Sequence, residues 1–349
     1  MAIEELISKA TRAYFALIKD FNFRNGTNPK TILKLFDSLI QPILLYCAEI
    51  WGPFGWRKND QKNILQHLFD HKQRFEFLHT KMCKNVLGIH KGASDLMARA
   101  EVGRYPLMSK IVKHLYSYWQ HILRANKDSL LYDTAHYIIV NGNKGQLNYF
   151  TRLKALFEAL NCKSMIKLCS EDKISSTSNI IKNAFCKKYA CHFANILQEK
   201  GERVNSGGRF DIYYKVKKNY GFENYLFMKN QNLRRHITCI RTSTHSLPIE
   251  YLRKFKVEET KRICILCNTN EIGNEKHYIT DCNNQDITAL RNKLYDILSN
   301  INSQWTLLDS HQKFLYLISA VDPTYNFYFA IFLDRLFTII NQKEKLRKL

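Results

Sequence analysis

Residues 261–282 read KRICILCNTNEIGNEKHYITDC and hold the pattern Cys-x2-Cys-x9-His-x4-Cys. Two thiolates three positions apart can grip one side of a small cation through a tight turn, and a His and a third Cys complete a tetrahedron. Sulfur and imidazole ligands favour Zn2+ over Mg2+ or Ca2+. Because four protein ligands leave no position for water, the pattern predicts one structural zinc ion, held by Cys264, Cys267, His277 and Cys282.

The spacing of the last two ligands also predicts a local distortion. The segment NEKHYIT is typical of a short helix that carries His277, and Cys282 follows five residues later. On an ideal helix the two side chains would point about 140° apart. Since both cannot then reach one metal, we expect the helix to loosen before Cys282, where Asp281, Asn283 and Asn284 favour a helix end.

Composition indicates a folded protein with a polyanionic partner. The chain has 349 residues, of which 45% are hydrophobic and 13% aromatic, enough for two or three domains with a sizeable core. The formal net charge of +22 favours binding to RNA or DNA. An acidic membrane surface is the weaker alternative, because no basic amphipathic helix adjoins a lipidation signal.

The positive charge lies ahead of the metal pattern. Residues 201–263 carry 14 Lys and Arg against 6 Asp and Glu, and residues 61–130 carry 12 against 5. Residues 264–349 carry 9 of each sign and are neutral. The segment that leads into the zinc module is therefore the expected electrostatic footprint, rather than the module itself.

Cysteine usage and hydropathy indicate an intracellular protein, in the nucleus or the cytoplasm. No secretory signal is seen, and three of the ten cysteines fit a metal site that an oxidising compartment would disrupt. No membrane span is expected, since Asp334 and Arg335 interrupt the most apolar stretch.

Hydrophobic periodicity predicts a mainly α fold, because strand-type alternation is nearly absent. The longest patterns cover residues 2–20, 30–50, 60–88, 106–126 and 150–200, and Pro42 is expected to kink or split the second of them. We expect consecutive regions: a thumb-like and connector region at 1–130, a helical linker at 131–205, a basic helical segment at 206–263, the zinc module at 264–285 and C-terminal helices at 286–349.

Several blocks of sequence resemble one family. They are LFDSLIQPILLYCAEIWG (35–52), KMCKNVLGIHKGASDLMARAEVGRYPL (81–107), RRHITCIRTSTHSLPIEYLRK (234–254) and the zinc segment. In this order the chain resembles the thumb, connector and C-terminal zinc regions of non-LTR retrotransposon reverse transcriptases, the LINE-type and jockey-like elements. The resemblance is patchy between residues 130 and 230 and after residue 285.

The same resemblance implies that the chain is not an enzyme by itself. In the family, a Tyr-x-Asp-Asp motif and a further Asp of the palm hold the metals for nucleotidyl transfer. This chain contains no Asp-Asp pair and nothing like the palm or the endonuclease. We expect a non-catalytic C-terminal fragment of a longer polyprotein, whose partners are RNA or DNA and the missing upstream polymerase domain. No small-molecule substrate is evident.

Basic residues interleaved with Tyr251 and Phe255 are the expected nucleic-acid contacts. In the family-like block at 81–107, Lys84 and Arg99 also lie between apolar residues and could contact nucleic acid. For any one of these cations the competing interpretation is an ordinary side chain on the solvent-exposed face of a helix. The predicted contacts are Arg234, Arg235, Arg241, Arg253, Lys254, Lys256, Lys261, Arg262, Lys91 and Arg104.

Other candidates are weaker. Trp51, Trp56 and Trp119 could stack on bases, but tryptophans beside a Gly-Pro turn more often pin the loop to the core. Cys186 and Cys191-His192 match no common zinc spacing and fit buried thiols on a helix. Two alternatives to sequence-tolerant nucleic-acid binding stay open: a zinc-stabilised protein-interaction scaffold, and a functionless retrotransposon remnant.

Overall fold

The computed structural model describes residues 2–20, 27–52, 61–70, 72–201, 210–320 and 322–347. Within these ranges the protein is built from seventeen α-helices joined by short 3-10 and π-helical turns. The only β-pairings among them are two isolated bridges, Val102 with Phe222 and Ile263 with Ile272. The predicted mainly α fold is therefore confirmed. Each helix in these ranges is too short or too polar to cross a lipid bilayer.

The chain divides into two compact units that alternate along the sequence. The first unit takes Met1–Leu17, Leu35–His79 and Tyr105–Ala194, and the second takes Ile18–Lys34, Thr80–Arg104 and Asn195–Leu349. This division differs from the consecutive regions expected from the sequence. Hydrophobic periodicity shows where a helix forms, but it does not show which distant helix it packs against.

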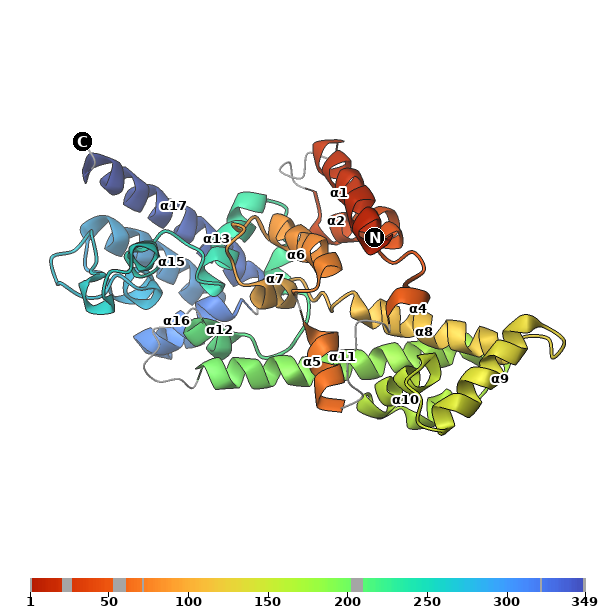
Figure 1. The fold of residues 1–349 in the computed structure, drawn as a ribbon. Coiled ribbons are helices and arrows are strands. Elements are labelled where there is room, and N and C mark those ends of the chain that lie inside the picture. The colour runs from red at the N-terminus through yellow and green to blue at the C-terminus, as the bar shows by residue number, and fades with distance from the viewer. Residues whose placement is uncertain are drawn as a thin grey trace. The chain divides into compact units, whose positions relative to one another are not determined.

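The first unit holds most of the helices from the N-terminal half (Figure 1). Its elements include α1 (Ala2–Asp20), the π-helical turn η1 (Phe36–Ile40), α3 (Gln41–Leu44), α4 (Ala48–Trp51), α5 (Gln61–Phe69), the start of α6 (Arg74–Leu87), α8 (Met108–Leu123), α9 (Leu130–Asn143), α10 (Tyr149–Ala159), η3 (Lys163–Ile166) and most of α11 (Glu171–Gly201).

Aromatic side chains close the core of the first unit. Phe69 on α5 packs edge-on against Phe185 and Tyr189 on α11, with both ring centroids 5.4 Å away. Trp119 on α8 is 1% exposed, and its indole Nε1 donates to the Ile166 carbonyl at 3.1 Å. Such edge-on packing and satisfied ring donors are usual for buried aromatic residues.

The second unit is an assembly of shorter elements around α13 and α17, which pack along each other (Figure 1). Its elements are α2 (Pro29–Leu35), the end of α6, α7 (Asp95–Glu101), α12 (Phe210–Val216), η4 (Asn224–Phe227), α13 (Gln231–Arg241), α14 (Pro248–Tyr251), η5 (Leu252–Phe255), η6 (Glu259–Lys261), η7 (His277–Asp281), α15 (Gln285–Ile301), η8 (Ser303–Leu307), α16 (Ser310–Ser319) and α17 (Pro323–Arg347).

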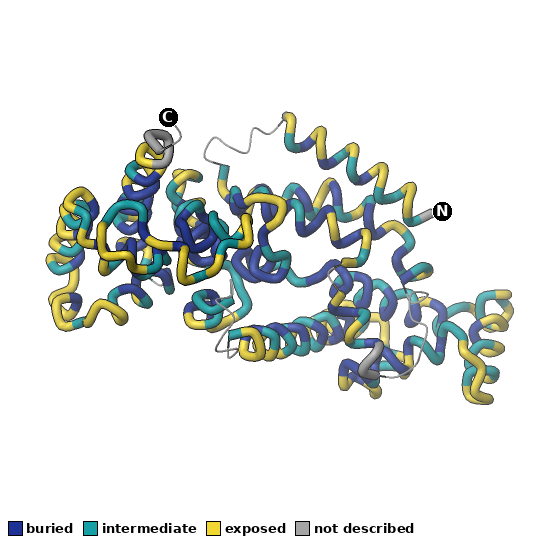
Figure 2. The backbone as a smooth tube through the Cα atoms, turned by 60° about the vertical axis from the view of Figure 1, so that its left-hand side comes forward, coloured by how far each residue is buried: buried dark blue, intermediate teal, exposed yellow. Residues whose placement is uncertain are grey.

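Most predicted helices form, with breaks at identifiable residues. The pattern at 30–50 is split as expected, because a π-helical turn precedes Pro42 and α3 begins beside it. The pattern at 60–88 is two helices rather than one, since α5 ends at Phe69 and α6 begins at Arg74. Along several helices the burial colours of Figure 2 alternate between one dark blue face and one yellow face, as amphipathic helices require. Residues 202–209, at the boundary between the expected linker (131–205) and the expected basic segment (206–263), lie outside the described residues.

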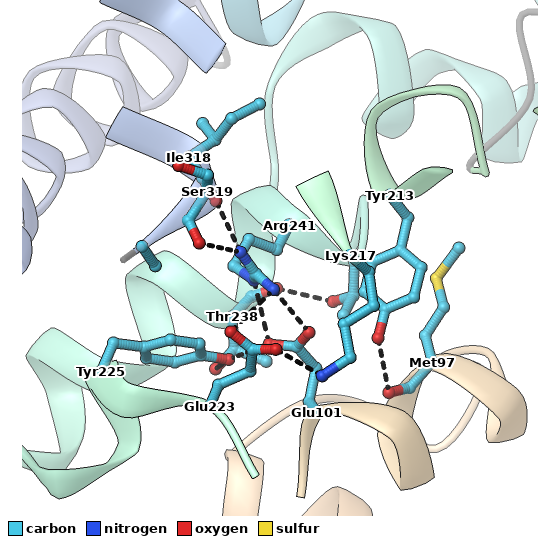
Figure 3. A network of polar contacts seen from close by, with 12 residues as sticks. Met97, Glu101, Tyr213, Lys217, Glu223, Tyr225, Thr238, Arg241, Ile318 and Ser319 are labelled. Atoms are coloured by element: carbon cyan, nitrogen blue, oxygen red, sulfur yellow. Dashed lines mark hydrogen bonds and ion pairs between the residues drawn. The ribbon is translucent and has the colours of Figure 1, made fainter. Parts of the chain in front are cut away.

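A network of buried charges lies in the second unit (Figure 3). Arg241 on α13 is fully buried, and its Nε and Nη2 donate to the two carboxylate oxygens of Glu101, each at 3.0 Å. Its Nη2 also lies 3.2 Å from Glu223. Its Nη1 donates to the backbone carbonyls of Ile318 and Ser319, at 2.7 and 3.0 Å. One guanidinium therefore ties four distant segments of the chain together.

The remaining members of the network balance its charge. The Lys217 ammonium donates to Glu223, and the Tyr225 hydroxyl donates to Glu101. Burial alone would raise the pKa of Glu101, but the neighbouring Arg241 and Lys217 hold it below its ordinary value. Burial and the nearby Glu101 charge raise the pKa of Glu223. Two cations against two carboxyl groups make this a paired polar core, which is the arrangement that buried charges require.

Candidate metal centre and its basic surroundings

The first two predicted ligands lie on a short loop closed by backbone bonds. The Cys264 amide donates to the Glu271 carbonyl at 2.8 Å, next to the bridge between Ile263 and Ile272. Within the loop, the Leu266 amide donates to the Cys264 sulfur at 3.4 Å. An amide aimed at a ligating sulfur stabilises its thiolate form, which is the form that binds metal.

A π-helical turn supplies the other two ligands. The turn η7 runs from His277 to Asp281, and the Cys282 amide donates to the His277 carbonyl at 2.7 Å. A hydrogen bond from residue i+5 to residue i widens the helical turn. The side chains of His277 and Cys282, which are five positions apart, can then point to the same side. The expectation that the helix loosens before Cys282 is confirmed. The chain then turns extended at Cys282, and Asn284 caps α15 through the Ile287 amide.

The four ligand atoms converge. All of them lie within 4.8 Å of one another, with Cys264 Sγ 3.9 Å from Cys282 Sγ and Cys267 Sγ 3.3 Å from His277 Nε2. Zinc bond lengths of about 2.3 Å to sulfur and about 2.0–2.1 Å to nitrogen require roughly 3.8 Å between sulfurs and about 3.5 Å from sulfur to nitrogen in a tetrahedron. The spacing of this group is therefore compatible with a metal site.

Glu271 orients the histidine. Its carboxylate lies 2.9 Å from His277 Nδ1, and a carboxylate can only accept, so Nδ1 carries the hydrogen and Nε2 faces the sulfurs. A carboxylate behind a ligating imidazole is a common arrangement in metal sites. The Cys-Cys-His-Cys pattern by itself does not point to Glu271. It is an acidic residue inside the ligand loop, but the spacing alone does not show which atom it reaches.

Charge also suits a cation at this position. The hydrogen bond between the two sulfurs lowers the pKa of Cys264, which favours the thiolate that binds metal, and raises the pKa of Cys282, which would lose its proton on binding a metal ion. Three thiolates, a neutral imidazole and Zn2+ sum to one negative charge. Arg291 is 8% exposed and donates to the Cys282 carbonyl at 2.8 Å, so its positive charge lies beside the group.

No family model, curated protein or solved structure matches this chain.

Three of the predicted nucleic-acid contacts are interior residues. Arg241 belongs to the buried network, and Arg234 is 2% exposed with its Nη1 donating to the carbonyls of Met228 and Lys229. Arg262 is 9% exposed and donates to the carbonyls of Val257 and Ile249. Because all three guanidinium groups are buried and bond to protein carbonyls or carboxylates, the expectation that they contact nucleic acid is corrected.

The other predicted contacts reach the surface to different degrees. Arg253 and Arg104 are partly exposed, and Arg253 pairs with Glu250 at 3.0 Å. Lys84 and Arg99, which the family-like block also suggested, are buried and bonded to Asp95 and Thr80 respectively. Five predicted cations are exposed: Lys91, Arg235, Lys254, Lys256 and Lys261.

The tryptophans and the second cysteine set do not form sites. Trp119 is in the core, and the Trp51 indole donates to the Tyr46 carbonyl at 2.9 Å, which pins its own turn. Trp56 lies outside the described residues. Among the residues that the structure describes, Cys186 and Cys191 join no group of metal-ligating side chains.

Replacing Glu271 by glutamine is expected to weaken zinc binding by about 10- to 100-fold, because the amide holds the His277 ring less firmly and lowers its basicity. Competition with a chromophoric chelator measures this affinity. Glu258→Gln is the matched control, since Glu258 is exposed and its carboxylate pairs with Lys261 at 3.2 Å, outside the ligand group. Equal zinc affinities for Glu271→Gln and the unaltered protein would contradict the role assigned to Glu271.

Proposed function

We propose that this chain is a zinc-stabilised, mainly α module that binds RNA or DNA without strong sequence preference. We further propose that it corresponds to the thumb, connector and C-terminal zinc regions of a non-LTR retrotransposon reverse transcriptase. The observation that carries the proposal is the convergence of Cys264, Cys267, His277 and Cys282 within 4.8 Å. The net charge of +22 and the family-like order of the sequence blocks support it.

Zinc is the metal that best fits this donor set. Three sulfurs and one imidazole suit a tetrahedral, borderline-soft ion, and four protein ligands leave no place for a reacting water. The metal would therefore stabilise the loop and the π-helical turn instead of taking part in catalysis. Glu271 and Arg291 would orient the ligands and compensate the charge of the centre.

Two exposed cations from separate blocks of sequence lie on one part of the second unit. Gly88 has a left-handed φ of +70°, and a Cβ placed there would lie 3.3 Å from the Arg235 side chain. Arg235 therefore packs against the turn that begins the Gly88 loop (residues 88–94). Lys84 holds that loop by donating to the Lys91 carbonyl at 2.7 Å. Lys91 and Arg235 are both exposed, so this is where we propose phosphate contacts.

Salt dependence tests the proposal. If Lys91 and Arg235 each neutralise a phosphate, the variant Lys91→Gln/Arg235→Gln should flatten the slope of log affinity against log salt by about 1.4 to 1.8 units. Fluorescence anisotropy with a mixed-sequence RNA and a DNA duplex, over a series of salt concentrations, measures the slope. Sequence preference should stay unchanged, because phosphate contacts carry no base information.

The control removes the same charge elsewhere. Lys144→Gln/Lys154→Gln neutralises two exposed lysines of the first unit, outside the family-like blocks, and should change the slope by much less than Lys91→Gln/Arg235→Gln. No measurable affinity at low salt, or equal slopes for the two double variants, would count against this interface. Absent affinity would also favour the scaffold function.

We expect no primer extension by this chain, with Mg2+ or Mn2+, on any RNA template. Nucleotidyl transfer requires carboxylates that hold two metal ions about 3.5–4 Å apart. The sequence has no Asp-Asp pair to supply them. The assay is incorporation of labelled nucleotide by the purified protein with an annealed primer. Template-dependent incorporation would show that the chain is an enzyme.

A protein-interaction scaffold is the second candidate, favoured by α9. Only Ala135 is buried on this helix, while Leu130 is 82% exposed and Tyr137 is 68% exposed. Exposed apolar side chains of this density on one helix are typical of interaction sites. Lys and Arg are absent from residues 128–143, so this helix is not a candidate for phosphate contacts.

A further inference from the structure

A short turn ahead of the metal centre displays one aromatic ring to solvent. The 3-10 turn η5 ends at Phe255, whose side chain is 64% exposed. Lys256 follows in the left-handed conformation, with φ of +57°, and reverses the chain direction. Tyr251 packs against the ring in a T-shaped arrangement, with the centroids 5.4 Å apart. The high exposure of Phe255 leaves ring surface open for another group to stack on.

Arg262 holds this turn in place. Its Nε and Nη2 donate to the Val257 carbonyl at 2.9 and 2.8 Å, and its Nη1 donates to the Ile249 carbonyl at 3.2 Å. The Val257 amide in turn donates to the Leu252 carbonyl at 3.3 Å. The buried guanidinium therefore ties together both ends of the segment that carries Phe255. A ring held in advance loses little conformational freedom when a ligand binds.

The charges around the ring are positive. Lys254 and Lys256 flank Phe255 and are exposed, and the ion pairs of the described residues include neither of them. Two of the three nearby acids are already paired, Glu250 with Arg253 at 3.0 Å and Glu258 with Lys261 at 3.2 Å, and the third, Glu259, is half-buried. The turn thus has one apolar ring, Phe255, between two cations. In a single strand a base lies between two phosphates, so the ring can stack on the base while the cations pair with the phosphates.

We propose that Phe255, Lys254 and Lys256 form a stacking site for one unpaired base of a single-stranded nucleic acid. This inference rests on the proposed function and deepens it, because it assigns single strands rather than duplexes as the preferred ligand. A duplex keeps its bases stacked on each other, so it can offer only phosphates to the two lysines. A single strand can offer a base face and the phosphates on either side together.

The test compares ligands and variants. Oligouridine and oligothymidine of about 15 nucleotides, and a duplex of similar length, are titrated by fluorescence anisotropy. Phe255→Leu keeps an apolar side chain but removes the ring face, and is expected to weaken single-strand binding by roughly 5- to 100-fold. Phe255→Trp should retain or strengthen it. Duplex affinity should change less than about twofold in both variants, because the phosphate contacts are kept.

Matched variants separate stacking from charge and from folding. Lys254→Gln/Lys256→Asn removes both charges, with asparagine chosen because it tolerates positive φ, and should flatten the salt slope for both ligand types. Phe227→Leu is the control for an exposed ring, since Phe227 is 50% exposed but Lys30 already covers its face at 4.4 Å. It should leave all affinities unchanged. Zinc content checks that each variant is folded.

The outcomes distinguish the two proposals. If the unaltered protein binds neither single strands nor duplex, the proposed function fails together with this inference. If the protein binds nucleic acid but Phe255→Leu matches Phe227→Leu on single strands, only the stacking site is overturned. Equal losses on single strands and duplex in Phe255→Leu would also overturn it, because they would indicate a change in the fold of the turn.

Discussion

Replacing His277 by alanine is expected to abolish stoichiometric zinc binding and to unfold the segment from Arg262 to Asn284. Structural zinc contributes about 10–16 kcal/mol of apparent binding free energy at neutral pH, and the ligands converge only when the segment is folded. Without the metal, the module is closed by individual hydrogen bonds, among them those from the Cys264 amide to Glu271, from the Gly273 amide to Arg262 and from the Ile265 amide to the Tyr278 hydroxyl, and each of these contributes only about 0.5–1.5 kcal/mol. Loss of the metal should therefore unfold the segment from Arg262 to Asn284.

Elemental analysis gives the zinc content, and amide hydrogen exchange followed by mass spectrometry reports the order of the segment. Cys264→Ser should behave like His277→Ala. Cys239→Ser is the control, because Cys239 is also buried but lies on α13, outside the ligand group. Full zinc content in His277→Ala would disprove the ligand assignment. A chelator that removes zinc without increasing exchange in this segment would disprove the structural role.

Replacing Arg241 by methionine is expected to lower the free energy of unfolding by about 3–5 kcal/mol. The substitution leaves the fully buried Glu101 without its main counter-charge and leaves the Ile318 and Ser319 carbonyls without donors. Removing one partner of a buried ion pair costs this much because the remaining charge stays desolvated. Urea unfolding followed by circular dichroism measures the change.

A second substitution tests the explanation. Arg241→Met/Glu101→Leu removes both charges and leaves the pair of Lys217 with Glu223 in place. Replacing a whole buried pair by apolar residues is often close to neutral, so the double variant should be more stable than Arg241→Met alone. If instead the losses of stability measured for Arg241→Met and for Glu101→Leu simply add in the double variant, the two residues are not coupled. The buried network would then be wrongly assigned.

Local features of the structure could be predicted because their causes are local. Ser94, a residue type favoured at this position, caps α7, with its side chain accepting from the Met97 amide. Pro42 divides its helix for a steric reason that involves only neighbouring residues. The metal group could be predicted as well, since all four ligands fall within one short stretch and the spacing of His277 and Cys282 already required a widened turn.

The interior of the second unit could not be predicted, because its partners are far apart in sequence. Arg241 looks like any surface arginine of a basic segment until α7 is packed against it. Arg234 and Arg262 could not be recognised for a different reason, because their partners are backbone carbonyls 5 to 13 residues away, which leave no trace in residue identity. Net charge measures the cations of a segment, but only burial shows how many of them remain available to a polyanion.

The buried contact between Glu101 and Arg241 joins residues 140 positions apart, and this separation has a consequence for synthesis of the chain. A ribosome adds about 5–20 residues per second, so Glu101 waits roughly 7–28 s before its partner exists. During that time the apolar side chains that α7 buries in the folded protein, among them Leu96, Met97 and Ala98, lack the later segments of the second unit that cover them. The metal loop faces no such delay, because its ligands span residues 264–282 and close over a short loop. Chaperone dependence during translation should therefore fall on residues 80–104, long before zinc is needed.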